Sequence, residues 1–324
     1  MVTFIPAILI LFALFIMELA YFKIADHYNI IDKPNARSSH QAVTLRGGGI
    51  IFSLAVIIFF IVSDFQYFYF VIGLISIATI SFLDDILTLK NKVRLSVHFV
   101  SVLFMFYQWQ LFTQPWYYLA IALIFVIGTI NAYNFMDGIN GITGAYSLLA
   151  TLTLYYINVK IVSFTSSDLL IILAFSLIVF NFFNFRKKAK CFAGDVGSVS
   201  IAFVLIFLIG QLILKTGNFG YILLFLFYGL DTASTIIFRK IRKENIFEAH
   251  RSHFYQYLAN QKKWSHLGVT ILYVTIQFLL NLVLLLYINM GIIPILISVV
   301  MVAILFLGVR FGIEGKDYLL KAHN

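Results

Sequence analysis

Residues 117–144 read YYLAIALIFVIGTI-NAYNFMDGINGITG, and the two halves of this stretch decide the fold. The first half, Tyr117 to Ile130, is an apolar run that crosses most of a bilayer, because a spanning helix needs about 20 mainly apolar residues. The second half, Asn131 to Gly144, contains three asparagines, one aspartate and three glycines. Polar groups are costly in lipid, so such a cluster is expected at a membrane face or in a wet cavity. A glycine-rich turn between two helices is the structural alternative, and the stretch alone favours neither interpretation.

The composition extends this interpretation to the whole chain. Of the 324 residues, 61% are apolar, 17% aromatic and only 11% charged. A soluble protein of this length needs far more charge, so the chain is a polytopic helical membrane protein. The first basic residue, Lys23, follows the first apolar run, which predicts a retained helix and not a cleaved signal peptide. The single cysteine, Cys191, excludes an internal disulfide and a cysteine-based metal site.

Apolar runs predict an all-α single domain over residues 1–324 with about eleven transmembrane helices. The runs lie at residues 3–25, 47–63, 67–83, 95–111, 117–133, 143–160, 168–184, 197–215, 220–238, 267–288 and 293–310. With the N-terminus outside, 21 of the 23 Lys and Arg residues fall in inner loops. This asymmetry predicts a periplasmic N-terminus and a cytoplasmic C-terminus, and it assigns the net charge of +9 to membrane topology rather than to nucleic-acid binding.

The polar clusters all lie on the predicted cytoplasmic face. A transporter needs ionisable groups near the bilayer centre, whereas the predicted helix centres here are almost wholly apolar. The first cluster is the inner loop from Asp32 to Gly49, which combines basic residues and hydroxyls with a triple glycine before a helix. Such groups suit phosphate binding by backbone N–H groups and side chains. A basic loop that follows the positive-inside rule is the alternative.

The second cluster is Asp84-Asp85 at the inner end of the third predicted helix. Adjacent carboxylates repel each other, so one is protonated unless a cation is near. Oxygen ligands without His or Cys favour Mg²⁺ or Mn²⁺. An intramembrane prenyltransferase also uses aspartate-bound Mg²⁺, but it needs a third aspartate on the same helix face, and none follows here.

The third cluster contributes Asn134, Asp137 and Asn140, and the fourth places Asp195 between glycines before the eighth predicted helix. Asp195 is a good ligand for a hard metal, with room for phosphates beside it. Capping of the helix is the alternative, and the segment alone favours it.

The fifth cluster, His250-Arg-Ser-His253, lies in a basic inner loop. Two histidines three residues apart suit zinc, but no third ligand of matching type is near, so phosphate recognition fits better. We expect a helix along the membrane surface over residues 241–258. Asp231 and Arg239, at the end of the ninth predicted helix, are expected to form a supporting pair.

These motifs, in this order, resemble those of the polyprenyl-phosphate N-acetylhexosamine-1-phosphate transferases, a branch of glycosyltransferase family 4. The matching pieces are Asp84-Asp85, Asn131-x-x-Asn-x-x-Asp-Gly-x-Asn-Gly141, Phe192-x-Gly-Asp-x-Gly-Ser198 and the His/Arg loop at 250–253. The family includes the enzyme that makes lipid I of peptidoglycan and the initiators of O-antigen and teichoic-acid linkage. With the eleven expected helices, the resemblance covers nearly the whole chain.

The resemblance implies a role for each motif residue. Asp195 takes the position of the Mg²⁺ ligand, with Asn134 in support, and Mn²⁺ is the alternative metal. Asp84 and Asp85 take the positions that engage or deprotonate the lipid phosphate, and Asp137 is a fourth catalytic candidate. The substrate-binding candidates are Asn140 for uracil, His250, Arg251 and His253 for the diphosphate or sugar, and Arg37, Thr44 and Arg46 for phosphate.

The implied reaction transfers an N-acetylhexosamine 1-phosphate from a UDP-sugar to undecaprenyl phosphate and releases UMP at the bacterial inner membrane. The His-Arg-Ser-His loop and the first-loop wording most resemble the subgroup that starts O-antigen and other surface polysaccharides, and they make the peptidoglycan enzyme a poorer match. Asn140 stands where many bacterial relatives have aspartate. GlcNAc, GalNAc, FucNAc and QuiNAc all stay open as the sugar, as do direct attack, an aspartyl intermediate and a homodimer. The rival functions are a lipid-carrier flippase or transporter and a Mg²⁺-dependent intramembrane prenyltransferase.

Overall fold

The computed structural model describes residues 4–32, 43–87, 89–246, 250–288 and 291–321. In these residues the fold is almost entirely helical, as the apolar runs predict. The elements are α1 (Phe4–His27), β1 (Ile31–Asp32), β2 (Thr44–Leu45), α2 (Ile50–Val62), α3 (Phe68–Leu87), α4 (Asn91–Gln108), α5 (Trp116–Met136), α6 (Ile142–Lys160), α7 (Ser167–Asn184), α8 (Gly194–Thr216), α9 (Leu226–Ile241), α10 (Phe254–Asn260), α11 (His266–Tyr287), α12 (Ile292–Glu314) and α13 (Lys316–Leu320). A 3-10 helix, Phe219–Phe225, leads directly into α9.

Each of the eleven predicted runs is helical, which confirms the all-α membrane fold. Among the described residues, eight helices are long and apolar enough to cross a membrane, and these are α1, α3, α5, α7, α8, the 219–241 helix that ends in α9, α11 and α12. The other three predicted spans are α2, α4 and α6. Of these, α2 has only 13 residues, so its length of about 20 Å falls short of the hydrocarbon core.

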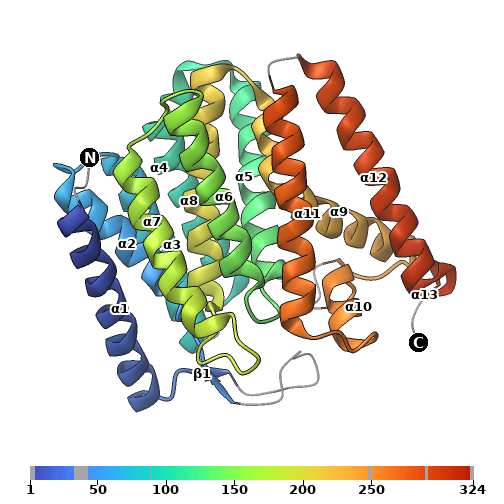
Figure 1. The fold of residues 1–324 in the computed structure, drawn as a ribbon, viewed down its shortest axis with the longest axis horizontal. Helices are drawn as coiled ribbons and strands as arrows, with labels where there is room; N and C mark the ends of the chain where they lie inside the picture. The colour runs from blue at the N-terminus through green and yellow to red at the C-terminus, as the bar shows by residue number, and fades with distance from the viewer. Residues whose placement is uncertain (1–3, 33–42, 88, 247–249, 289–290, 322–324) are drawn as a thin grey trace.

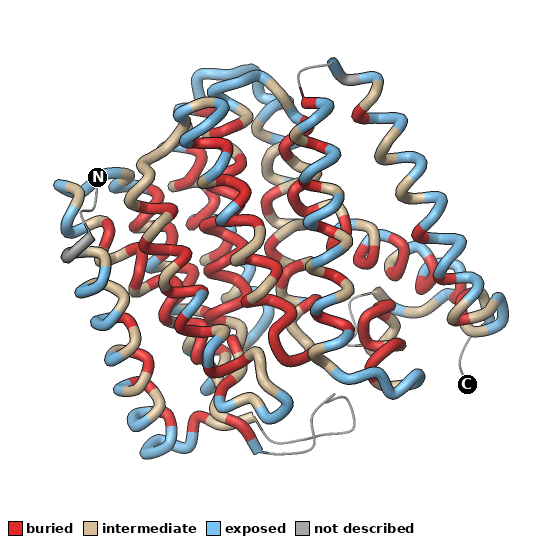
Figure 2. The backbone as a smooth tube through the Cα atoms, viewed as in Figure 1, coloured by how far each residue is buried: buried red, intermediate tan, exposed pale blue. Residues whose placement is uncertain are grey.

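Helix α8 is the centre of the bundle. In the most apolar 18-residue stretch of α8, 83% of the residues are buried inside the protein, whereas the corresponding share is 17% in α1 and in α12. Figures 1 and 2 show α8 surrounded by other helices and α1 and α12 at the outside. Its neighbours are α2, α3, α5 and α6. The position of α8 explains its composition, because a helix that is apolar all round is stable only where other helices or lipid surround it.

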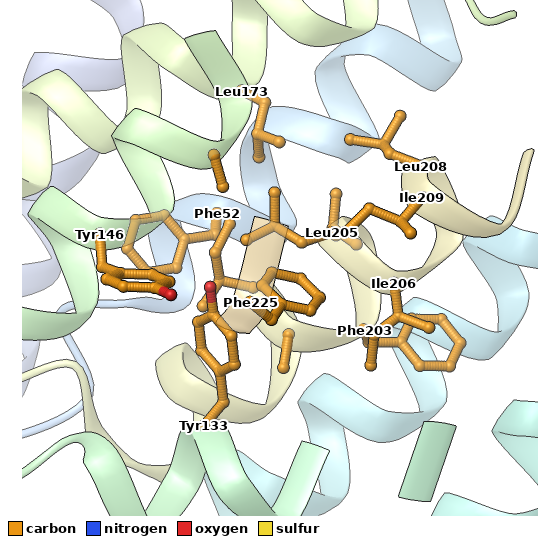
Figure 3. Close-up of a cluster of buried hydrophobic side chains, with 14 of the residues drawn as sticks. Phe52, Tyr133, Tyr146, Leu173, Phe203, Leu205, Ile206, Leu208, Ile209 and Phe225 are labelled. Atoms are coloured by element: carbon orange, nitrogen blue, oxygen red, sulfur yellow. The ribbon is translucent and has the colours of Figure 1, made fainter. Parts of the chain in front are cut away.

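The core around α8 is built from large side chains of several helices. Figure 3 shows Phe203 and Leu205 of α8 with Phe52 of α2, Tyr133 of α5 and Tyr146 of α6. All five are essentially inaccessible to solvent. This packing holds α5 and α8 against each other, and the ends of these two helices carry part of the predicted site.

The expected surface helix over residues 241–258 is wrong in its extent. Helix α9 ends at Ile241, and the next helix, α10, covers only Phe254–Asn260. The start of α10 is set by Asp231 of α9, whose carboxylate accepts hydrogen bonds from the backbone N–H groups of Phe254 and Tyr255. A buried acceptor more than 20 residues earlier in the chain thus decides where this helix begins.

Candidate active site

Three of the predicted clusters meet at one end of the bundle, beside the β1–β2 pair (Figure 1). Asp84 and Asp85 end α3, and Asp195 lies in the first turn of α8. Asn134, near the end of α5, accepts a hydrogen bond at 2.8 Å from the Ser198 hydroxyl of α8. Because these helices pack on one another, residues 50 to 110 positions apart in sequence lie in one cluster.

Asp85 caps helix α8 from another helix. Its two carboxylate oxygens accept hydrogen bonds from the N–H groups of Asp195 at 2.9 Å and Val196 at 3.0 Å. The Arg46 guanidinium pairs with the same carboxylate at 2.7 Å, and the Asp85 side chain is fully buried. The first N–H groups of a helix have no partner within the helix, so Asp85 supplies what α8 lacks.

This arrangement excludes one of the two interpretations of Asp195, that it caps α8, and leaves its role as a metal ligand a prediction. Since Asp85 caps α8, the Asp195 carboxylate is not the cap and points elsewhere. It lies 3.4 Å from Arg46 and 3.5 Å from Arg94, with 19% of its side chain exposed. Of the three carboxylates in the cluster it is the most accessible to a ligand.

Asp84 is held differently from its neighbour. One oxygen accepts from the Leu89 N–H at 2.6 Å, and the other pairs with Arg94 of α4. Each member of the Asp84-Asp85 pair therefore has its own arginine, which answers the expected repulsion between them. Arg94 bridges Asp84 and Asp195, and it is a site residue that the sequence analysis missed. The sequence contained a signal for this role, because Arg94 is a basic residue in the first turn of α4 and follows the Asp84-Asp85 pair closely in the chain.

Two of the three N–H groups of the triple glycine are used within the protein and are not free for phosphate as expected. The N–H groups of Gly48 and Gly49 donate to the carbonyls of Phe192 and Ala193. A Cβ at Gly49 would lie only 2.3 Å from the Cα of Gly197, so these glycines allow the start of α2 to touch the start of α8. The loop contributes Arg46 to the site by this close contact.

The remaining phosphate candidates of the first loop are less central. Thr44 is buried in β2, paired with Asp32 of β1. Arg37 lies outside the described residues. Arg46, in contrast, contacts the carboxylates of Asp85 and Asp195.

Asp137 lies just beyond α5 and accepts a hydrogen bond from the Thr143 hydroxyl at 2.7 Å. Burial raises its pKa from 3.8 to about 7, with the nearby Asp195 and Asp85 acting in the same direction. A carboxyl group with a pKa near the working pH suits proton exchange. The geometry is therefore compatible with the predicted catalytic role.

Replacing Asp137 by asparagine should reveal this pKa in the pH dependence of stability. Because the folded-state pKa is raised, the Asp137 contribution is favourable below about pH 4 and is lost as the pH rises through about 7. Thermal unfolding of Asp137→Asn and wild type should diverge in favour of the variant from pH 4 to pH 8. The upper bound is about 4 kcal/mol, and the effect is smaller because Asp137 is only half-buried. A stability difference that does not change with pH would contradict the assignment.

Asn140 joins segments of the backbone. Its side-chain amide donates to the backbone carbonyl of Arg186 at 2.8 Å, and its backbone carbonyl accepts from the Thr270 hydroxyl at 2.9 Å. Asn140 thus ties the α5–α6 turn to the α7–α8 loop and to α11. Its place as the uracil contact stays a prediction.

The His loop lies beside the same α5–α6 stretch. The rings of His250 and His253 stack with their centroids 5.0 Å apart, and Phe135 lies 6.1 Å from His250. Burial and the neighbouring His253 lower the pKa of His250 to about 3, so His250 is neutral at physiological pH. Arg251 lies between them in the loop and is partly buried.

The expected pairing of Asp231 with Arg239 is wrong, although both residues support the fold. Arg239 pairs with Glu244 at 3.0 Å and donates to the Asn245 carbonyl at 2.6 Å. Asp231 bonds instead to the His loop, to α10 and to Tyr273. Five residues after Arg239 the chain turns back, and this turn brings Glu244 within reach.

The donor set fits a hard divalent cation. Within the described residues, no group of three or more His, Cys, Asp or Glu side chains is arranged to hold a metal by itself. Mg²⁺ does not need such a cage, since it is usually bound by one or two carboxylates plus substrate phosphates and water. Asp195 and Asp84, which share the Arg94 guanidinium, already converge on a positive charge, and Asn134 adds an amide oxygen nearby.

Comparisons with known proteins match the part of the chain that carries this cluster. The model of glycosyl transferase family 4 matches residues 67–213, which contain the Asp84, Asn134 and Asp195 motifs. The phospho-N-acetylmuramoyl-pentapeptide-transferase of Thermotoga petrophila is 28% identical over 261 residues, which cover 74% of this chain and 82% of the relative.

Relatives of a second kind match at similar identity. The probable undecaprenyl-phosphate N-acetylglucosaminyl 1-phosphate transferase of Bacillus subtilis is 25% identical over 265 residues, 73% of this chain and 71% of the relative. The undecaprenyl-phosphate alpha-N-acetylglucosaminyl 1-phosphate transferase of Salmonella typhi is 28% identical over 211 residues, 58% and 56% of the two chains. Overall identity therefore does not separate the two kinds. The family match, these relatives and the convergence of the motifs on one end of a helical membrane bundle show that the chain is similar to the transferases of glycosyl transferase family 4.

Proposed function

We propose that the chain transfers an N-acetylhexosamine 1-phosphate from a UDP-sugar to undecaprenyl phosphate and releases UMP. The observation that carries this proposal is the cluster of Asp84, Asp85 and Asp195 with Arg46 and Arg94 at the ends of packed helices. Alternating carboxylates and guanidinium groups can hold both a metal ion and phosphate oxygens. Phosphoryl transfer depends mainly on such positioning and charge stabilisation.

The reaction exchanges one pyrophosphate linkage for another. An oxygen of the lipid phosphate attacks the sugar-bearing phosphorus of the UDP-sugar, and the bond from that phosphorus to UMP breaks. Both reactants are anionic, so cations are needed between them. When bound, Mg²⁺ supplies positive charge to the phosphate oxygens, with Asp195 and Asn134 as its protein ligands.

We assign the remaining residues by their contacts. Asp84 is held by Arg94 and the Leu89 N–H, and it engages the lipid phosphate. Arg46 and Arg94 are partly exposed, at 32% and 25%, so they can reach substrate phosphates. Asp85 sets the position of α8 and of Asp195.

The setting in the bilayer suits two substrates of opposite character. Undecaprenyl phosphate is supplied by the membrane, and a UDP-sugar by the cytoplasm. A site at helix ends, on the face that the charge pattern assigns to the cytoplasm of an inner membrane, can receive both. The sequences of the His loop and of the first inner loop favour the subgroup that starts O-antigen or other surface polysaccharides. The protein acts either as a monomer or as a homodimer.

The products of the purified protein test this proposal. The protein in detergent is incubated with undecaprenyl phosphate, Mg²⁺ and, in separate reactions, UDP-GlcNAc, UDP-GalNAc and other UDP-N-acetyl sugars. We expect mass spectrometry of the lipid fraction to find undecaprenyl diphosphate linked to one N-acetylhexosamine. A lipid joined to a new acceptor through its prenyl carbon would indicate a prenyltransferase instead. Binding of undecaprenyl phosphate with no chemical product from any donor would indicate a lipid-carrier transporter.

A further inference from the structure

Asp231, outside the carboxylate cluster, is the acceptor of an unusually large set of buried hydrogen bonds. Its side chain is fully buried in α9. One oxygen faces the His253 Nδ1 at 3.3 Å and accepts from the Phe254 N–H at 2.9 Å. The other accepts from the Tyr273 hydroxyl at 2.6 Å. Asp231 therefore both caps α10 and fixes the histidine that precedes it.

The other ring nitrogen of His253 has no such partner. The His253 ring is 2% exposed, and its Nε2 is buried without a hydrogen-bond partner among the described residues. A buried polar atom left without a partner destabilises the fold. Each such atom in a folded protein needs an explanation, and a bound substrate is one.

The surroundings of His253 lead to the active site. Its ring is stacked on His250 and lies 6.4 Å from the Phe135 ring. The hydroxyl of Tyr255, in the first turn of α10, donates to the Phe135 carbonyl at 2.9 Å. Phe135 directly follows Asn134, so α10 and its histidine are attached to the stretch that carries the proposed metal site.

A second charged residue holds the loop in place from the outermost helix. Arg310 of α12 is 1% exposed, and it donates to the Ser252 carbonyl at 3.1 Å and to the Thr235 hydroxyl at 3.0 Å. It lies 3.9 Å from Asp231 and pairs with Glu314. Arg310 balances the buried carboxylates and anchors the backbone beside His253.

We propose that Asp231 is a positioning residue that acts through His253: it accepts the Nδ1–H, so that Nε2 is the atom presented to the phosphate or sugar of the UDP-sugar. The hydrogen bond at one ring nitrogen sets the tautomer and the orientation of the other. This proposal rests on the proposed transferase function. The simpler alternative is that Asp231 only caps α10.

A double-mutant cycle separates the two roles. Asp231→Asn and His253→Gln are each expected to lower kcat/KM for the UDP-sugar by more than about tenfold, by analogy with carboxylates that orient a histidine. The double variant should be no worse than His253→Gln, because Asp231 has nothing left to position. If the two losses multiply instead, Asp231 does not act through His253.

Tyr273→Phe is the matched control for loss of a buried contact. It removes one hydrogen bond to Asp231 but leaves the oxygen that faces His253. We expect it to lower the unfolding temperature, because it removes a buried hydrogen bond to a charged carboxylate, and to leave kcat/KM within about threefold of wild type. A loss of kcat/KM equal to that of Asp231→Asn would assign both effects to structural support alone.

Nitrogen-15 NMR of the histidine rings tests the positioning without any turnover. Of the seven histidines, His253 is identified by the signal missing from His253→Gln. We expect Nδ1 of His253 to be protonated in wild type and its signals to shift in Asp231→Asn. A neutral ring protonated only at Nε2 would overturn the proposal. Because this readout needs no substrate, it remains decisive even if the wild type releases no UMP, which would count against the transferase function itself.

Discussion

Asp195→Asn is expected to abolish transfer while leaving the fold intact. The Asp195 carboxylate does not cap α8, because Asp85 does, so the substitution removes a ligand and no structural hydrogen bond of the helix start. Asparagine keeps the shape but not the charge that a divalent cation requires. We expect kcat to fall by at least about 10²–10³-fold, the range for loss of one electrostatic group in an active site.

The control for Asp195→Asn is Asp317→Asn in α13. Asp317 is 77% exposed and, among the described residues, pairs with Lys321 at the surface, so neither activity nor stability should change. The unfolding temperature of Asp195→Asn should lie close to that of wild type. Full activity in Asp195→Asn at saturating Mg²⁺ would show that the metal assignment is wrong.

Asp85→Ala is expected to lose stability as well as activity. The substitution leaves the N–H groups of Asp195 and Val196 without acceptors and Arg46 without its buried partner. Breaking a buried pair from one side costs about 3–5 kcal/mol, and the 32% exposure of Arg46 places this case near or below the lower end.

The comparison of the two neighbouring aspartates sharpens this prediction. Denaturation and activity are measured on the same preparations of Asp84→Ala and Asp85→Ala. Both variants should lose activity, but Asp85→Ala should be clearly the less stable, because only Asp85 caps a helix. If Asp85→Ala unfolds at the wild-type temperature, Asp85 does not hold α8 in place.

The sequence was sufficient for the helices and for finding the polar residues that the structure brings together. Apolar runs locate helices well because lipid and a helical core demand the same long apolar segments: residues 197–215 were expected where α8 covers Gly194–Thr216. The polar residues that interrupt these runs stood out for the same reason. The structure then brings Asp84, Asn134 and Asp195 to one end of the bundle.

The separate roles of the site residues depend on contacts between residues that are far apart in the sequence. Asp84 and Asp85 are adjacent residues of the same type, so the sequence does not distinguish their roles. Only the packing of α3 on α8 makes Asp85 the cap of α8. The triple glycine suggests phosphate binding until Gly197 is placed against Gly49. The helix expected over residues 241–258 shortens to Phe254–Asn260 because Asp231, far upstream, caps it. No local pattern contains these pairings.

The most direct measurement is UMP release by the purified protein with undecaprenyl phosphate, a UDP-N-acetylhexosamine and Mg²⁺, for wild type and Asp195→Asn side by side. We predict UMP from wild type only when both substrates are present, complete loss with EDTA, recovery on adding Mg²⁺, and none from Asp195→Asn. UMP release that continues without undecaprenyl phosphate, or that survives both EDTA and the loss of Asp195, would contradict the proposed transfer.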